Sequence, residues 1–331
     1  MNRLVIPIIF FITLFLILIF NSCEKGIIGI QDVYSDLDKI PTQKTLHIST
    51  YEGSCQPIHP DVVYFEEGYR GHYYYMSFTP YPFGQSKCEN PCIVVSNNGV
   101  DFYEEKPGIN PLVTFPANGY NDDPDLIYNQ EKELFHLYYL ETMRPDSQNV
   151  VIMTSNNGLK WKRAALIHYD LKNADPFILS PACIMTGSDF LLFFVNSSAP
   201  NKPVQYLKSE DGIEWHPNDI HTIDYTLPPN LKPWHIDIFS GGNIFYLLVC
   251  GPHPNTDLYI AMSRDLKKWT FYPEPILDHR ATFFGPCDRV YRSCGVARND
   301  LLIVWFSFRR LDGSWGIGVK KFTLSTLFIE E

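Results

Sequence analysis

A seven-residue phrase that recurs along the chain constrains the fold more than any other feature of the sequence. It reads serine, any residue, asparagine or aspartate, glycine, two further residues and an aromatic one, and its copies begin at Ser96, Ser155 and Ser209. A fourth copy at Ser263 has lost the glycine. The Asn or Asp side chain can bond to its own backbone, Gly can take a positive φ, and the ring can pack beneath the turn. Copies about 54 to 59 residues apart indicate a repeated structural unit.

Strand-like segments surround each copy of the phrase. A middle segment of each unit is aliphatic or aromatic nearly throughout, at residues 73–78, 134–140, 190–195, 244–249 and 301–308. A continuous apolar run is typical of a strand that is covered on both faces. The pattern predicts an all-β fold, a five-bladed β-propeller with four-stranded blades, in which the radial arrangement protects most sheet edges. Two β-sandwich domains are the alternative fold.

The N-terminal segment predicts export. Arg3 is followed by an apolar run over residues 4–20 and then by Asn21, Ser22 and Cys23, which is the layout of a signal peptide. Its end resembles a bacterial lipobox, in which Cys23 is lipidated, and an uncleaved membrane anchor is the alternative. We therefore expect a lipoprotein signal peptide at 1–22, a tether at 23–45 and the propeller at 46–331. The mature protein is expected in the cell envelope, lipid-anchored at the outer membrane or cell surface and exposed outside the cytoplasm.

Ring closure and cysteine use can also be predicted. We expect residues 46–51 to add an outer strand to the last blade, because few C-terminal residues remain for it. Lipidation of Cys23 would leave seven of the eight cysteines, so at least one would have no partner within the chain. Cys88 and Cys92 could close a small loop. No second cysteine or histidine pair stands at ligand spacing, so zinc is not expected.

The net charge of the chain argues against nucleic acid as a binding partner. The formal net charge is −10 and the sequence contains no basic stripe, so nucleic acid is not an expected partner. Uncharged or lightly charged ligands fit this composition better.

The first strand of each unit carries polar residues at two positions that are two residues apart. One position holds His59, Asp123, Ser180, His235 and Arg292. The other holds Asp61, Asp125, Ala182, Asp237 and Cys294. Side chains two apart on a strand share a face, and the first strands of a propeller converge on its channel. We expect these groups to crowd one mouth of the ring, where proximity can separate carboxylate pKa values as acid–base catalysis requires.

Loop residues could join the same mouth. Glu89 and Glu141 follow the middle strands of the first two units, although an acidic loop residue is as often simply solvated. Tyr81 and Trp234 lie near the same points and could stack on sugar faces.

The blade count, the repeated phrase and the inner-strand sequence Pro-Asp-(Val/Leu)-(Val/Ile)-Tyr resemble the five-bladed propeller glycoside hydrolases. This group includes arabinanases, β-xylosidases and fructan-cleaving enzymes, and the resemblance covers nearly all of the mature chain. It implies two carboxylates that flank the scissile bond and a third acid that tunes the proton donor. Asp125 carries over most directly, because Asp123-Pro124-Asp125-Leu126 matches Ala-Pro-Asp-Val of many members. His59, Ser180 and His235 stand where the group has acids.

Two classes of function remain open. In a glycoside hydrolase, Asp61 would be the base, Asp125 the orienting or pKa-setting acid, and Asp237, Glu89 or Glu141 the proton donor. The residues expected to bind its carbohydrate substrate are His59, Asp123, His235, Arg292, Tyr81 and Trp234. The alternative is a non-catalytic surface glycan-binding lipoprotein. Neither requires a cofactor, although the resemblance allows a structural calcium ion near His235.

Overall fold

The computed structural model describes residues 36–173, 175–229, 231–252 and 256–328 of the chain. Cys23 and the apolar run before it lie outside the described residues, so export and lipidation stay predictions. Within the described residues, every helix is too short or too polar to cross a bilayer. The chain divides into residues 1–39, of which the 3-10 turn η1 (Asp36–Lys39) is described, and residues 40–331.

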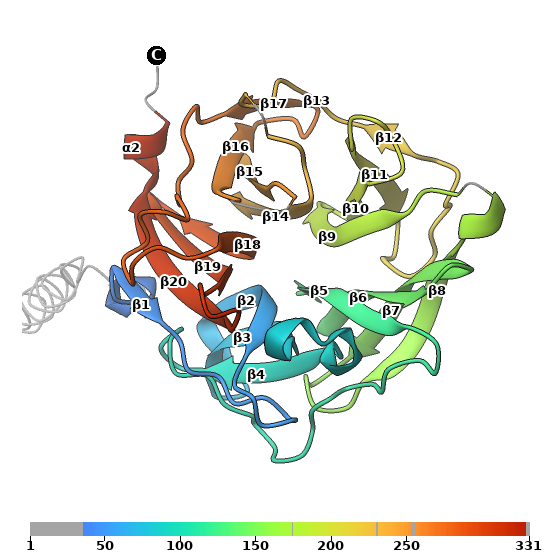
Figure 1. Cartoon of the computed structure of the whole chain (residues 1–331), viewed down its shortest axis with the longest axis horizontal. Helices are drawn as coiled ribbons and strands as arrows, with labels where there is room; N and C mark the ends of the chain where they lie inside the picture. Colours follow the sequence, from blue (N-terminus) through green and yellow to red (C-terminus); the bar gives the residue numbers. More distant parts are fainter. Residues whose placement is uncertain (1–35, 174, 230, 253–255, 329–331) are drawn as a thin grey trace, which may run out of the picture. The chain divides into compact units, whose positions relative to one another are not determined.

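Residues 40–331 form five sheets arranged radially around an axis (Figure 1), which confirms the predicted propeller. Blade 1 comprises β2 (Pro57–Tyr69), β3 (His72–Pro80) and β4 (Cys92–Ser96). Blade 2 comprises β5 (Tyr120–Asn129), β6 (Leu134–Met143), β7 (Ser147–Ser155) and β8 (Lys162–Asp170). Blade 3 comprises β9 (Ile178–Thr186), β10 (Asp189–Asn196), β11 (Val204–Ser209) and β12 (His221–Thr222).

The last two blades complete the ring. Blade 4 comprises β14 (His235–Gly241), β15 (Ile244–Cys250), β16 (Leu258–Ser263) and β17 (Lys268–Phe271), with β13 (Asp224–Tyr225) parallel to β17. Blade 5 comprises β18 (Arg289–Arg298), β19 (Leu301–Arg309) and β20 (Trp315–Thr323). The outer edge of blade 1 has an isolated bridge between Val95 and Tyr103 in place of a fourth strand.

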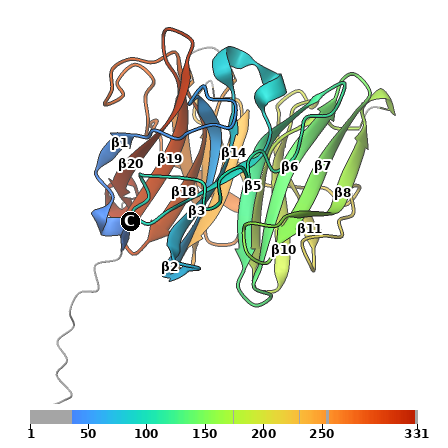
Figure 2. The ribbon, with the colours of Figure 1, turned by 90° about the horizontal axis from the view of Figure 1, so that it is seen from below.

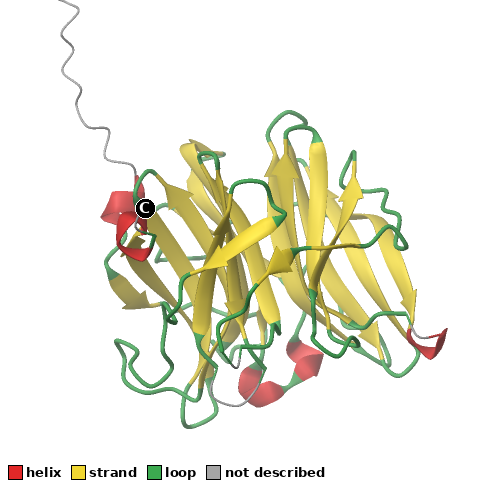
Figure 3. Ribbon diagram, turned by 90° about the horizontal axis from the view of Figure 1, so that it is seen from above, coloured by secondary structure: helices red, strands yellow, loops and turns green. Residues whose placement is uncertain are grey.

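Helical segments are short and lie in the connections, as Figure 3 shows. They are η2 (Pro82–Gly84), η3 (Ser86–Cys88), η4 (Leu171–Asn173) and α2 (Leu324–Leu327). In the side view of Figure 2, the segment that contains η2 and η3 projects from one face of the ring. Every cysteine among the described residues carries a free thiol, Cys88 and Cys92 included.

The N-terminal part of the propeller closes the ring. Strand β1 (Gln43–Thr45) pairs antiparallel with β20 and becomes the outer strand of blade 5. The backbone N–H of Leu46 continues this pairing by donating to the carbonyl oxygen of Ile317 at 2.9 Å. The strand therefore precedes the predicted segment 46–51 by a few residues. Pairing between the two ends of the domain removes an exposed sheet edge.

The apolar middle strands pack between neighbouring blades. Phe193, Leu247 and Val249, for example, are buried in one cluster between blades 3 and 4. Burying a side chain of this size stabilises a fold by roughly 1.5–3 kcal/mol, and a comparable cluster lies between blades 1 and 2.

The repeated phrase forms the predicted turn in all four copies. In the third copy, Ser209 Oγ accepts hydrogen bonds from the amides of Asp211 and Gly212, and Asp211 Oδ1 accepts from Ile213 and Glu214. In the fourth copy Leu266 occupies the glycine position with φ of 60°, so the turn forms there despite the strain of a left-handed leucine.

Candidate functional site

The innermost strands β2, β5, β9, β14 and β18 contact one another in a closed circle and line the channel. Their two polar positions form two successive layers in the channel rather than a single crowded mouth. We call His59, Asp123 and His235 the histidine layer, and Asp61, Asp125 and Asp237 the carboxylate layer. All six side chains are buried.

The carboxylate layer bonds neighbouring blades to each other. Asp61 Oδ2 accepts a hydrogen bond from the backbone N–H of Leu126 in blade 2. Asp125 Oδ2 accepts from Cys183 in blade 3 at 2.9 Å, and Asp237 Oδ2 accepts from Gly295 in blade 5 at 3.1 Å. Each acid therefore satisfies a backbone donor of an adjacent inner strand.

The carboxylate layer is also electrostatically crowded. One oxygen of each acid lies within 4.8 Å of the others. Burial raises the pKa of Asp61 to about 6, and burial followed by the charge of Asp61 raises the pKa of both Asp125 and Asp237 well above the usual range. The layer faces a cavity of about 580 Å³ that is lined by later residues of the inner strands, on the side away from the histidine layer.

Backbone bulges direct His59 and Asp123 of the histidine layer into the channel. His59 and Asp123 have φ of 54° and 50°, and the strand register shifts at both positions. A bulge of this kind re-aims a side chain relative to a regular strand. Asp123 Oδ2 accepts a hydrogen bond from the backbone N–H of Ser180 in blade 3 at 2.9 Å, which leaves Oδ1 directed at the two imidazoles.

Three ligand atoms converge in this layer. Asp123 Oδ1 lies 3.4 Å from His59 Nε2 and 3.3 Å from His235 Nδ1. Within the described part of the chain, neither these three atoms nor His235 Nε2 has a hydrogen-bond partner, although all are buried. Buried polar atoms without partners are costly. Two imidazoles and one carboxylate form a common catalytic zinc site that keeps a position open for water, so the residues fit a divalent transition-metal ion.

The protonation states suit a metal site. Burial lowers the pKa of His59 to about 3, so its imidazole is neutral at pH 7, the form that binds metals. Burial acts to raise the pKa of Asp123, but His235, His59 and Arg292 together lower it well below the usual range.

The channel carries an excess of buried acid. Asp61, Glu89, Asp123, Asp125 and Asp237 are all at most 7% exposed. The buried cation beside them is Arg292, whose Nη1 lies 3.5 Å from Asp123 and whose Nη2 lies 3.7 Å from Asp125. Its Nη2 also donates to the carbonyl oxygen of Pro181 at 2.8 Å. Arg292 therefore lies between the two layers and is close to one acid of each.

A carboxylic acid and aromatic rings border the histidine layer. Glu89 Oε1 lies 3.9 Å from His59 Nδ1. Burial, followed by the charges of Asp122 and Asp123, raises the pKa of Glu89 well above the usual range. The ring of Tyr291 lies 4.2 Å from that of His235, and its hydroxyl oxygen accepts a hydrogen bond from Trp234 Nε1 at 3.1 Å.

The structure places the remaining predicted residues in different surroundings. Glu141 accepts a hydrogen bond from Asn149 at 2.9 Å and lies 3.4 Å from Arg163, so it contacts the outer strands of blade 2. Tyr81 packs against Trp315. Burial, followed by the charge of Glu89, raises the pKa of Tyr81 to about 12.

Tyr291 and Asp122 are site neighbours that the sequence reasoning missed. Tyr291 directly precedes the predicted Arg292, and Asp122 directly precedes the predicted Asp123. Their adjacency to those residues was the available signal.

No family model matches the chain. An A type blood N-acetyl-α-D-galactosamine deacetylase of Flavonifractor plautii is 37% identical over 86 residues, which are 25% of this chain but only 11% of that protein. A solved N-acetylgalactosamine deacetylase from F. plautii, in complex with blood group B trisaccharide, superposes with a TM-score of 0.72 at 21% identity. That alignment covers 86% of this chain and 96% of the other.

Glycosidases share the fold at lower similarity. An exo-1,5-α-L-arabinanase from a bovine ruminal metagenomic library has a TM-score of 0.58 at 12% identity, with 80% of this chain and 92% of that chain covered. The catalytic domain of a GH62 α-L-arabinofuranosidase from Coprinopsis cinerea has a TM-score of 0.58 at 13% identity, with 85% and 96% covered. The predicted resemblance to five-bladed propeller glycoside hydrolases is thus confirmed for the fold.

The hydrogen bonds of the carboxylate layer predict a stability effect. Asp125→Ala should lower the free energy of unfolding by about 1–3 kcal/mol, because it leaves the buried N–H of Cys183 without an acceptor. Asp125→Asn keeps an acceptor oxygen and should cost less. The exposed Glu131→Ala is the control and should stay within about 0.5 kcal/mol of the parent. Chemical denaturation measures all three, and an Asp125→Ala protein as stable as the parent would contradict this role.

Proposed function

We propose that the protein is a metal-dependent hydrolase that removes the acetyl group from an N-acetylated sugar. The observation that carries this proposal is the convergence of His59 Nε2, Asp123 Oδ1 and His235 Nδ1, buried and without hydrogen-bond partners in the described structure. The likeness to N-acetylgalactosamine deacetylases, in a stretch of sequence and in fold, supports the choice of substrate.

A divalent ion held by this layer would polarise the acetyl carbonyl and lower the pKa of a bound water. Glu89 lies beside the layer, and its raised pKa is typical of a carboxyl group that both takes and gives a proton during catalysis. It would take a proton from the attacking water and then give it to the departing amide nitrogen. The C–N bond breaks, a C–O bond forms, and the products are acetate and a free amino sugar.

The glycoside hydrolase interpretation finds less support in the geometry. Asp61, Asp125 and Asp237 hold backbone amides of neighbouring blades, so each already has a structural partner. A glycosidase needs two carboxylates roughly 5–9.5 Å apart across the scissile bond. Glu89 would be one of these carboxylates. The second would be the partly exposed Asp122, whose charge has the largest effect of any neighbouring acid on the pKa of Glu89. Glycan binding without catalysis would leave the raised pKa of Glu89 without a role.

We also propose that the domain is displayed outside the cytoplasm on a lipid attached to Cys23. The support is the lipobox-like end of the apolar run over residues 4–20. Cys23→Ala should abolish lipid labelling and membrane association, and unchanged fractionation would contradict the anchor.

Metal titration of the chelator-stripped protein tests the catalytic proposal. We expect Zn²⁺ to bind at one site per chain, and His235→Gln and Asp123→Asn to weaken binding at least about 100-fold, since even outer partners of metal ligands contribute about 10–100-fold. The exposed His47→Gln is the control and should bind like the parent. Glu89→Gln should keep the metal but lower acetate release by about 100-fold to 10,000-fold.

The products distinguish the alternatives. The zinc-loaded protein should release acetate from oligosaccharides that end in N-acetylgalactosamine or N-acetylglucosamine, and a chelator should stop the release. New reducing ends that form despite the chelator would indicate a glycosidase instead. Binding of these glycans without any turnover would indicate a glycan-binding protein.

A further inference from the structure

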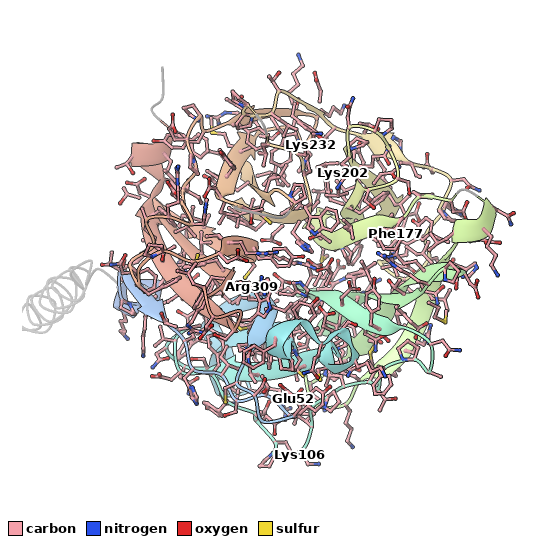
Figure 4. All side chains as sticks on the ribbon, viewed as in Figure 1. Glu52, Lys106, Phe177, Lys202, Lys232 and Arg309 are labelled. Atoms are coloured by element: carbon pink, nitrogen blue, oxygen red, sulfur yellow. The ribbon has the colours of Figure 1, made fainter. Side chains whose placement is uncertain are left out.

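Two lysines lie beside the channel without an acidic partner. Lys202 is in the connection between β10 and β11, and Lys232 shortly precedes β14. Figure 4 shows them close together on the side of the ring formed by blades 3 and 4. Within the part of the chain that the structure describes, neither forms an ion pair with a carboxylate. Burial, followed by the like charge of Lys232, lowers the pKa of Lys202.

Trp234 connects the lysines to the histidine layer. The Lys202 ammonium lies 4.1 Å from the centre of the Trp234 ring, which is itself 6.4 Å from the centre of the His235 ring. The ammonium is therefore at most about 10.5 Å from the centre of the His235 ring. Trp234 also donates its hydrogen bond to Tyr291, which packs on His235. Lys202 therefore lies within reach of a sugar next to one that would be bound at the histidine layer.

The positive charge of Lys202 and Lys232 is opposite in sign to the net charge of the chain. The chain has a formal net charge of −10, yet the charged neighbour that acts on Lys202 is a second lysine, Lys232. Charges separated by more than about 8 Å are largely screened at physiological ionic strength. The local pair, rather than the distant acids, would therefore decide which ligands bind at this position.

We propose that Lys202 and Lys232 form a subsite for an anionic group on the glycan, a uronic acid carboxylate or a sulfate ester. The anionic group would sit on the sugar next to the acetylated one, and this placement rests on the proposed deacetylase function. Either anion would accept charge-assisted hydrogen bonds from the ammonium groups. The subsite makes the preferred substrate an acidic glycan, in contrast to the uncharged or lightly charged ligand that the composition favours.

Two matched pairs of probes test the subsite and separate its two anions. The first pair is an unsulfated chondroitin tetrasaccharide and its carboxyl-reduced form, and the second is N-acetyllactosamine with and without a 6-O-sulfate. Calorimetry on the zinc-loaded full chain should give about tenfold tighter binding of the acidic member of at least one pair. Lys202→Gln and Lys232→Gln should remove this preference and leave binding of the neutral members unchanged.

Lys106→Gln is the matched control, because Lys106 is exposed at the outer edge of the ring in Figure 4. It should keep the full preference. Equal binding of acidic and neutral members by the parent, no binding of any probe, or an equal loss of both members in Lys202→Gln would overturn the subsite. Acetate release is assayed separately. Acidic preference without acetate release would contradict the deacetylase alone, and acetate release without preference would contradict the subsite alone.

Discussion

Hydrogen bonds that buried carboxylates accept from the backbone of the next blade fix the geometry on which the candidate site depends. Asp125 accepts a hydrogen bond from the backbone N–H of Cys183. Two residues earlier on the same strand, Asp123 accepts one from the backbone N–H of Ser180. Because both bonds cross from blade 2 to blade 3, they hold neighbouring inner strands in one register. The imidazoles of His59 and His235 come from blades 1 and 4, which are joined in the same way. Asp61 accepts from Leu126 between blades 1 and 2, and Ser180 Oγ accepts from Ile236 between blades 3 and 4.

The same arrangement concentrates negative charge where water has little access. Arg292 offsets part of it, and its nitrogens lie 3.5 Å from Asp123 and 3.7 Å from Asp125. Removing a charged group from water is expensive unless a partner compensates it. Several acids in the channel accordingly have raised pKa values, and the unpartnered atoms of the histidine layer point to the place where a divalent ion would be most stabilised.

The repeat made the blade count predictable from sequence, because its serine and Asn or Asp side chains form their hydrogen bonds within the phrase itself. The two-residue spacing also correctly indicated that Asp61, Asp125 and Asp237 would lie together. Two residues span about 6.6 Å along a strand, so the spacing itself separates the two positions into successive layers. The directions of His59 and Asp123 could not be predicted in this way, because they depend on backbone bulges.

The convergence of His59, Asp123 and His235 escaped prediction for a related reason. Spacing rules detect ligands that are close in sequence, whereas His59, Asp123 and His235 meet only when the ring closes. Likewise, the contact between Lys202 and Trp234 joins a loop of blade 3 to the start of blade 4. A contact between two blades cannot be predicted from a local sequence pattern.

Anomalous diffraction from crystals soaked in Zn²⁺ and recorded at the zinc absorption edge would locate a bound ion in the channel. We expect a strong peak between His59 Nε2, Asp123 Oδ1 and His235 Nδ1, at distances of about 2.0–2.2 Å from each. A peak that appears only at the carboxylate layer, or at the separate group of Asp257, Asp278 and His279, would contradict it, as would the absence of any peak in the channel.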